Sequence, residues 1–134
     1  MTVREKVFHQ GEGKHLVELI AKFTGRGIDV LLTGGENPHI GGVVLAHPRE
    51  SLTGRGMSCD TWVIPVPGHK DIEALKDLAE TLARLTGQTV VASGGINISR
   101  AELWDIEEVL QNTKKAGEEL VHYCLEQGIV QQQA

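Results

Sequence analysis

The first third of the chain alternates apolar and polar positions with the period of two that is typical of half-buried β-strands. Residues 2–9 and 15–24 are the first two predicted strands, and apolar side chains occupy every second position from Val17 to Phe23. Short apolar runs bounded by glycines predict two buried strands at 28–33 and 41–47. Because short glycine turns join these strands and no crossover helix fits between them, we expect an antiparallel meander.

The next region loses this alternation. Residues 48–60 carry no periodicity, and a polar stretch of this length in a compact domain is typical of a functional loop or a disordered one. The run TWVIPV at 61–66 predicts an edge strand, because Pro65 and Pro67 cannot donate hydrogen bonds to a β-ladder.

Helical spacing then begins. Apolar residues recur in steps of three and four from Ile72 to Leu85, which predicts one amphipathic helix with a single buried stripe. Asp71 is its expected N-cap and Gly87 its expected end. QTVVA at 88–92 predicts a further strand.

The C-terminal region is also helical by its spacing. Ser99 and Glu102 have the separation of a capping box, and apolar residues then recur at helical intervals as far as Cys124. A continuous helix over 100–127 would be roughly 42 Å long, whereas a domain of this size is about 30 Å across. The helix therefore either bends near the polar stretch 111–115 or projects one end onto a partner subunit, and we expect the bend.

These elements make a single domain over residues 1–130, followed by a disordered tail at 131–134. The fold class is α+β, with a mostly antiparallel sheet, one amphipathic helix and C-terminal helices. A chain of 134 residues is long enough for one core without disulfides or metal.

Charge and targeting signals narrow the classes of partner. The net charge is −5 and there is no basic run, which argues against nucleic-acid binding. Neither a secretory signal nor an apolar membrane span is present in the sequence. We expect a cytoplasmic protein without a membrane partner, in which Cys59 and Cys124 are reduced thiols.

Two segments share an uncommon pattern. TGGEN at 33–37 and SGGIN at 93–97 each place a hydroxyl residue, two glycines and an asparagine at the end of an apolar strand. They are either a pair of bulged turns or the floor of a pocket whose bare backbone suits a phosphate or a flat ring. We expect both at one rim of the sheet, with Gly35 and Gly95 within about 15 Å, or three strand spacings. The first loop is the better anion site, because Glu102 would repel a phosphate at the second.

Other chemistry is sparse. His9 and His15 are placed to meet across a hairpin, but no carboxylate or cysteine completes a metal-ligand pattern. No nucleophile lies in an esterase-type elbow, and Arg49 and Arg55 receive no role. The sequence contains no catalytic constellation, so we expect a protein that is not an enzyme.

The run LLTGGENPHIGGV resembles the motif of the prenylated flavin chaperone, or LpdD-like, family, and VVASGGINISRAEL resembles that family's later glycine segment. Members are small proteins found alongside gallate decarboxylase and related prenylated-FMN-dependent decarboxylases. The resemblance implies a non-catalytic chaperone that assists maturation or delivery of prenylated FMN to such a decarboxylase, or that stabilises the decarboxylase. It also implies a fold like that of the dimeric proteasome assembly chaperones.

Carried over by position, the resemblance implies a cofactor-binding site with prenylated FMN as a transient ligand. Its residues are Thr33, Gly34, Gly35, Asn37, Pro38, His39, Gly41, Gly94, Gly95 and Asn97. Asn37 and His39 are its expected working side chains. Replacing either with alanine is expected to leave thermal stability nearly unchanged and to weaken flavin binding or decarboxylase activation by roughly 1–3 kcal/mol.

Two alternatives stay open: a dimeric assembly protein that does not bind flavin, and a small hydrolase with His39 as its base. A homodimer is expected in either chaperone case, because the C-terminal helices are apolar over more length than one small sheet can cover.

Overall fold

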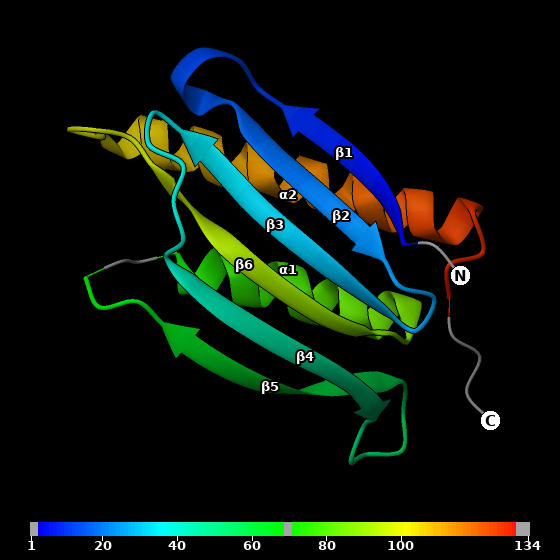
Figure 1. Ribbon diagram of the computed structural model, residues 1–134. Helices are drawn as coiled ribbons and strands as arrows, with labels where there is room; N and C mark the ends of the chain where they lie inside the picture. The colour runs from blue at the N-terminus through cyan, green and yellow to red at the C-terminus, as the bar shows by residue number, and fades with distance from the viewer. Residues whose placement is uncertain (1–2, 69–70, 131–134) are drawn as a thin grey trace.

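A six-stranded sheet carries two helices on one of its faces (Figure 1). This architecture is seen in a computed structural model, whose described residues are 3–68 and 71–130. The elements in chain order are β1 (Arg4–Gln10), β2 (Val17–Phe23), β3 (Gly27–Gly35), β4 (Gly42–Glu50), β5 (Met57–Pro65), α1 (Ile72–Thr86), β6 (Thr89–Asn97) and α2 (Leu103–Glu126), with a short 3₁₀ turn at Gly13–His15. Along the sheet the strand order is β1-β2-β3-β6-β4-β5.

The core lies between the sheet and the two helices. The alternation in β2 and β3 directs one set of side chains toward α1 and α2, and Val17, Leu19, Val30 and Leu32 are almost fully buried there. The apolar stripe of α1 meets them, with Leu75 and Leu82 fully buried. The other set of strand side chains points to the opposite face of the sheet, which no helix covers (Figure 1).

The predicted antiparallel meander is wrong at one place. β3 and β4 are not neighbours, because β6 lies between them, parallel to β3 and antiparallel to β4. The chain leaves β5, returns along α1 and re-enters the centre of the sheet. The run at 88–92 explains this position, because Val90 and Ala92 are fully buried and suit a central strand.

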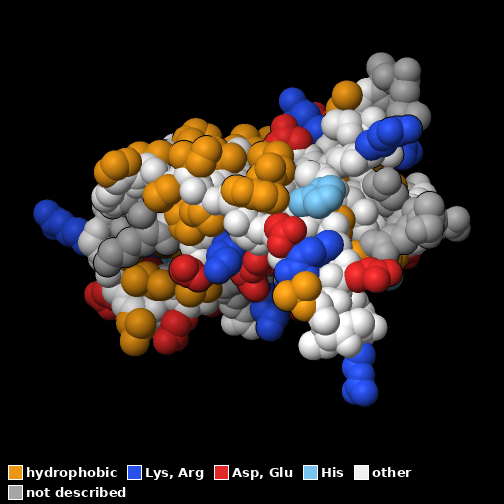
Figure 2. Space-filling view, turned by 90° about the horizontal axis from the view of Figure 1, so that it is seen from below, with side chains coloured by type: hydrophobic (Ala, Val, Ile, Leu, Met, Phe, Trp, Pro, Cys, Tyr) orange, Lys and Arg blue, Asp and Glu red, His pale blue; other side chains and the backbone are white. Residues whose placement is uncertain are grey.

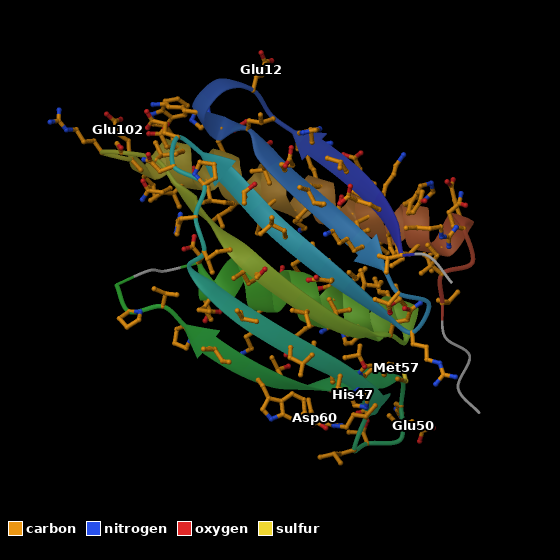
Figure 3. The ribbon with its side chains drawn as sticks, viewed as in Figure 1. Glu12, His47, Glu50, Met57, Asp60 and Glu102 are labelled. Carbon is orange, nitrogen blue, oxygen red and sulfur yellow. The ribbon has the colours of Figure 1, made fainter. Side chains whose placement is uncertain are left out.

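The predicted loop at 48–60 is also wrong. Residues 48–50 and 57–60 extend β4 and β5 into a hairpin, and only 51–56 form its turn. The segment is polar because the hairpin end protrudes past the core. Figure 3 shows His47, Glu50, Met57 and Asp60 together at this end, far from Glu102. The predicted edge position of β5 is confirmed.

The first helix agrees with its prediction, since α1 has Asp71 as N-cap and ends at Gly87, whose φ is +68°. The second does not. α2 runs for 24 residues without a break, so the expected bend is absent. The polar stretch at 111–115 is anchored to the fold by Asn112, whose Nδ2 donates to the carbonyl of His15 at 2.9 Å, while Thr113 Oγ1 donates within the helix to the carbonyl of Val109 at 2.7 Å.

The start of α2 also lies three residues later than predicted. Glu102 is the N-cap, and its capping box is completed by Asp105 instead of by Ser99. Neither helix of the described chain has the long apolar stretch that is needed to cross a membrane. The tail expected at 131–134 lies outside the described residues.

Candidate functional site

The two glycine segments lie side by side at one rim of the sheet. β3 and β6 are parallel neighbours, so that Thr33 pairs with Gly95 and Gly35 pairs with Asn97. The expectation that both segments share a rim is confirmed. The chain that leaves β3 stays attached to β6, because the backbone N–H groups of Glu36 and Asn37 both donate to the carbonyl of Asn97, at 2.8 and 3.2 Å.

The side chain of Asn37 strengthens this attachment. Its Nδ2 donates to Asn97 Oδ1 at 3.0 Å and lies 3.3 Å from Ser99 Oγ. The neighbouring Glu36 accepts a bond from the backbone N–H of Ser99 at 3.0 Å. The loop after β3 is therefore tied to the segment after β6 by side chains as well as by backbone.

His39 makes the second tie, with both ring nitrogens engaged. Nδ1 lies 2.9 Å from the carbonyl oxygen of Asn37, and Nε2 lies 2.9 Å from Asp71 Oδ2. The other carboxylate oxygen, Asp71 Oδ1, accepts a bond from the backbone N–H of Ile96 at 2.9 Å. Asp71 thus connects the start of α1 to the loop and to β6.

This geometry favours the imidazolium form of His39. Both partners of the ring are acceptors, so each nitrogen is best satisfied when it carries a proton. The hydrogen bond to the Asn37 carbonyl raises the pKa of His39 above 6.5, and the Asp71 carboxylate raises it further, while burial opposes both. When His39 is protonated, the site therefore holds a positive charge beside a carboxylate.

Two glycines make room for this pair. A Cβ on Gly95 would lie 2.5 Å from His39 Nε2, and a Cβ on Gly41 would collide with the Asp71 carboxylate. Gly35 and Gly94 are glycines for a different reason. Their φ angles of +75° and +126° are backbone values that residues with a side chain rarely adopt. The glycine motif is thus explained by the space that the His39–Asp71 pair needs and by the backbone turns around it.

The ring of His39 lies on the uncovered face of the sheet. Positions 91, 93 and 95 of β6 point to that face, since Val90 and Ala92 between them are buried under the helices. A Cβ on Gly95 would point at the ring of His39, so the ring covers β6 from that side. Its side chain remains 21% exposed, which leaves it accessible to a ligand.

A family model for the prenylated flavin chaperone LpdD-like domain matches residues 11–125. The chain belongs to this family. The matched range includes both glycine segments and Asp71, and it confirms the resemblance seen in the sequence.

Among solved structures, this LpdD-like domain is similar to a chain in the crystal structure of a novel chaperone complex for yeast 20S proteasome assembly. The two are 12% identical, the match covers 96% of this chain and 99% of that one, and the TM-score is 0.53. At this identity the likeness shows the fold alone, and it confirms the α+β fold expected from the sequence. No curated protein sequence matches the chain.

The LpdD-like site contains residues that the sequence did not single out. Asp71 was expected only as a helix cap, yet its side chain makes no capping bond and instead holds His39 and Ile96. Ser99 joins the site through Asn37. The sequence contains only an indirect indication of Asp71. Gly41 has no role in a predicted turn, and it is a glycine because the Asp71 carboxylate fills the space that a side chain would need.

Other histidines and arginines of the LpdD-like domain lie outside this site. His9 pairs with Glu18, and His15 pairs with Asp105, so the expected meeting of His9 with His15 does not occur. Arg49 binds Asp60 in the far hairpin at 2.8 Å. Within residues 3–68 and 71–130, no three His, Cys, Asp or Glu side chains are grouped as a metal site would need.

Proposed function

We propose that this LpdD-like protein is a non-catalytic chaperone that binds prenylated FMN transiently and assists its maturation or delivery to a partner decarboxylase. Family membership supports the flavin connection. The observation that carries the proposal is the assembly of both motif segments into one rim, around a histidine whose two ring nitrogens both face acceptors.

The chemistry of the rim suits a flavin phosphate and ring. An imidazolium at His39 can donate to a phosphate once the phosphate replaces Asp71 or the Asn37 carbonyl as its partner. The space beside the glycines at 34–35 and 94–95 is already filled by backbone or by the His39 ring, so a flat ring would lie against His39. A site of this kind holds a cofactor by charge and shape, which fits transient binding better than a closed pocket does.

A non-catalytic role agrees with the state of the two thiols. Cys124 is fully buried, and burial raises its pKa to about 11, so it is poorly suited to nucleophilic attack. Cys59 is half-buried, with its Sγ 3.8 Å from both Thr61 Oγ1 and Glu80 Oε2. Both are free cysteines, and we place the work of the chaperone in the cytoplasm, where thiols stay reduced.

The second candidate is a homodimeric assembly chaperone that does not bind flavin. The contacts of Asn37 and His39 favour this reading, because both side chains are already bonded within the loop and its neighbours. If Asn37 and His39 serve only these internal bonds, their role is to stabilise the fold and not to bind a ligand. Homodimerisation is common to both candidates and is part of the proposal.

Titration of the purified protein separates the two candidates. Prenylated FMN, FMN and prenyl phosphate are each titrated while flavin absorbance and heat are followed. We expect prenylated FMN to bind best. His39→Gln should weaken its binding by roughly 10- to 100-fold, the effect of losing one charged hydrogen bond of about 1.5–3 kcal/mol. His9→Gln, an exposed histidine on β1, is the matched control and should bind as the wild type does.

Absence of binding by all three ligands, together with stabilisation of the decarboxylase on mixing, would support the assembly chaperone instead. Equal weakening by His39→Gln and His9→Gln would show that the flavin binds elsewhere.

A further inference from the structure

The uncovered face of the sheet carries an apolar stripe that crosses all six strands. The strand registers align two rows of side chains on this face. One row is Val7, Ile20, Leu31, Ser93, Val43 and Ile64, and the other ends in Val91, Leu45 and Trp62. Ile64 is 68% exposed and Trp62 is 55% exposed. Figure 2 shows hydrophobic side chains gathered over the β5 edge on this side.

The unusual feature of this exposed face is its apolar character. Four of the five strand pairs are antiparallel, and the solvated face of such a sheet normally carries polar side chains. Both helices pack against the other face (Figure 1). The pattern is that of a surface that another protein covers.

Charge complementarity identifies the occupant. The charged half of the second row reads Glu5, Lys22 and Asp29 across three neighbouring strands, so both signs alternate on one face. Asp60 is also balanced by Arg49 on this face, and Glu18 bonds His9. A two-fold axis brings such a face onto itself, and acids can then meet bases.

The competing apolar surface has fewer bases to meet its acids. A groove of about 530 Å³ runs between α1 and α2, lined in part by Leu78, Leu85, Leu110, Val121 and Leu125. Its charged lining is acidic, with Glu73, Asp77 and Glu118 against Lys114. Two copies joined there would bring six carboxylates together with two lysines, and such like-charge contacts are unfavourable.

The size of the sheet face also fits a dimer. Six strands at about 4.8 Å spacing and strands of 7–9 residues make a face of roughly 600–700 Å² in projection. A standard interface buries about 800 Å² of accessible surface on each partner, and a surface of side chains has more accessible area than its projection.

We infer that a second copy of this chain covers the uncovered sheet face, so that the homodimer joins two sheets face to face with the helices outside. The sequence placed this interface on the C-terminal helices, and the charges of the structure move it to the sheet. The inference rests on the homodimer in the proposed function and does not depend on flavin binding.

Sedimentation velocity and light scattering over micromolar concentrations test the inference. The wild type is expected at twice 14.6 kDa. Ile64→Lys and Val7→Lys place a charge at opposite ends of the stripe, on exposed side chains, and each should raise the dimer dissociation constant at least tenfold. Leu110→Lys, at a 51% exposed leucine in the helical groove, is the matched control and should stay dimeric.

Thermal melting of the three variants shows that each is folded, since the replaced side chains are exposed. A monomeric wild type would overturn the inference, and so would a dimer that Leu110→Lys dissociates while Ile64→Lys and Val7→Lys do not. Capture of the decarboxylase by a monomeric wild type, lost in Ile64→Lys, would assign the face to that partner and also overturn it. Flavin titration is independent of these outcomes.

Discussion

At the scale of single residues, Asn37 and His39 show what sequence can and cannot identify. Their position in a glycine-rich motif marked them as functional, but the pattern gave no information on their partners. Their partners Asn97 and Asp71 are 60 and 32 residues away in the chain. The expectation that alanine at either position leaves stability unchanged therefore needs revision, because these side chains hold the rim together.

His39→Gln should lower the free energy of unfolding by about 1–2 kcal/mol at pH 6, the cost of weakened hydrogen bonds to a charged group. The folded protein raises the pKa of His39 above 6.5. The stabilisation is therefore complete below pH 6.5 and is lost as pH rises through the folded-state pKa. Urea unfolding of both proteins from pH 5.5 to 9 should show a difference that shrinks with rising pH. A constant difference would contradict the imidazolium assignment.

Gly95→Ala tests the space that the His39–Asp71 pair occupies. The added methyl group would lie 2.5 Å from the His39 ring, and overpacking of this kind costs about 1–3 kcal/mol. Gly117→Ala is the matched control, because in α2 the new methyl group meets only a flexible Leu78 methyl at 3.2 Å, and alanine favours a helix. Thermal melting should show a loss for Gly95→Ala alone, and equal melting temperatures would argue against the pair.

At the scale of elements, the sequence predicted each strand and the first helix because alternation and helical spacing are local signals. The sequence did not predict that β6 is the neighbour of β3. The strand order depends on where the chain re-enters the sheet after α1, and no local pattern indicates that position. The sequence also assigned the ends of β4 and β5, at 48–50 and 57–60, to a loop. Strands that extend beyond the core have no buried apolar residues at alternate positions, so the period of two is lost there. The prediction of a bend in α2 was wrong because Asn112 and Thr113 use their polar side chains in hydrogen bonds and do not mark a break in the helix.

The start of α2 contains a carboxylate, Asp105, whose pKa lies well below its ordinary value. The backbone N–H of Glu102 and the ring of His15 hold the pKa of Asp105 at about 2, below its usual 3.8, with Lys14 contributing. Its contribution to stability is therefore present above pH 3.8 and is lost as pH falls toward 2.

Asp105→Asn should lower the melting temperature at pH 6 and should flatten the decline of the melting temperature between pH 4 and pH 2. Glu108→Gln, an exposed position in the next turn of the same helix, is the control and should keep the wild-type profile. Circular dichroism melts across this range make the comparison. A decline as steep in Asp105→Asn as in the wild type would assign acid unfolding to other carboxylates.

At the scale of the whole molecule, the glycine rim and the apolar stripe lie close together. The glycine rim and the apolar stripe share the uncovered face of the sheet, with His39 over β6 beside the row that contains Ser93. A dimer of sheets would bring two rims to the borders of one interface. Family membership and overall fold were recognisable from the sequence, whereas this shared face needed the strand order.

We propose that prenylated FMN binds at the glycine rim, and backbone amide NMR tests this proposal. Titration of ¹⁵N-labelled protein with prenylated FMN should shift or broaden the amide signals of Gly34, Gly35, Gly94 and Gly95 at low ligand ratios. The signals of Gly54 and Gly56, in the turn at the far hairpin end, should stay in place. Unchanged rim signals at saturating ligand, or shifts confined to the α1–α2 groove, would contradict the account.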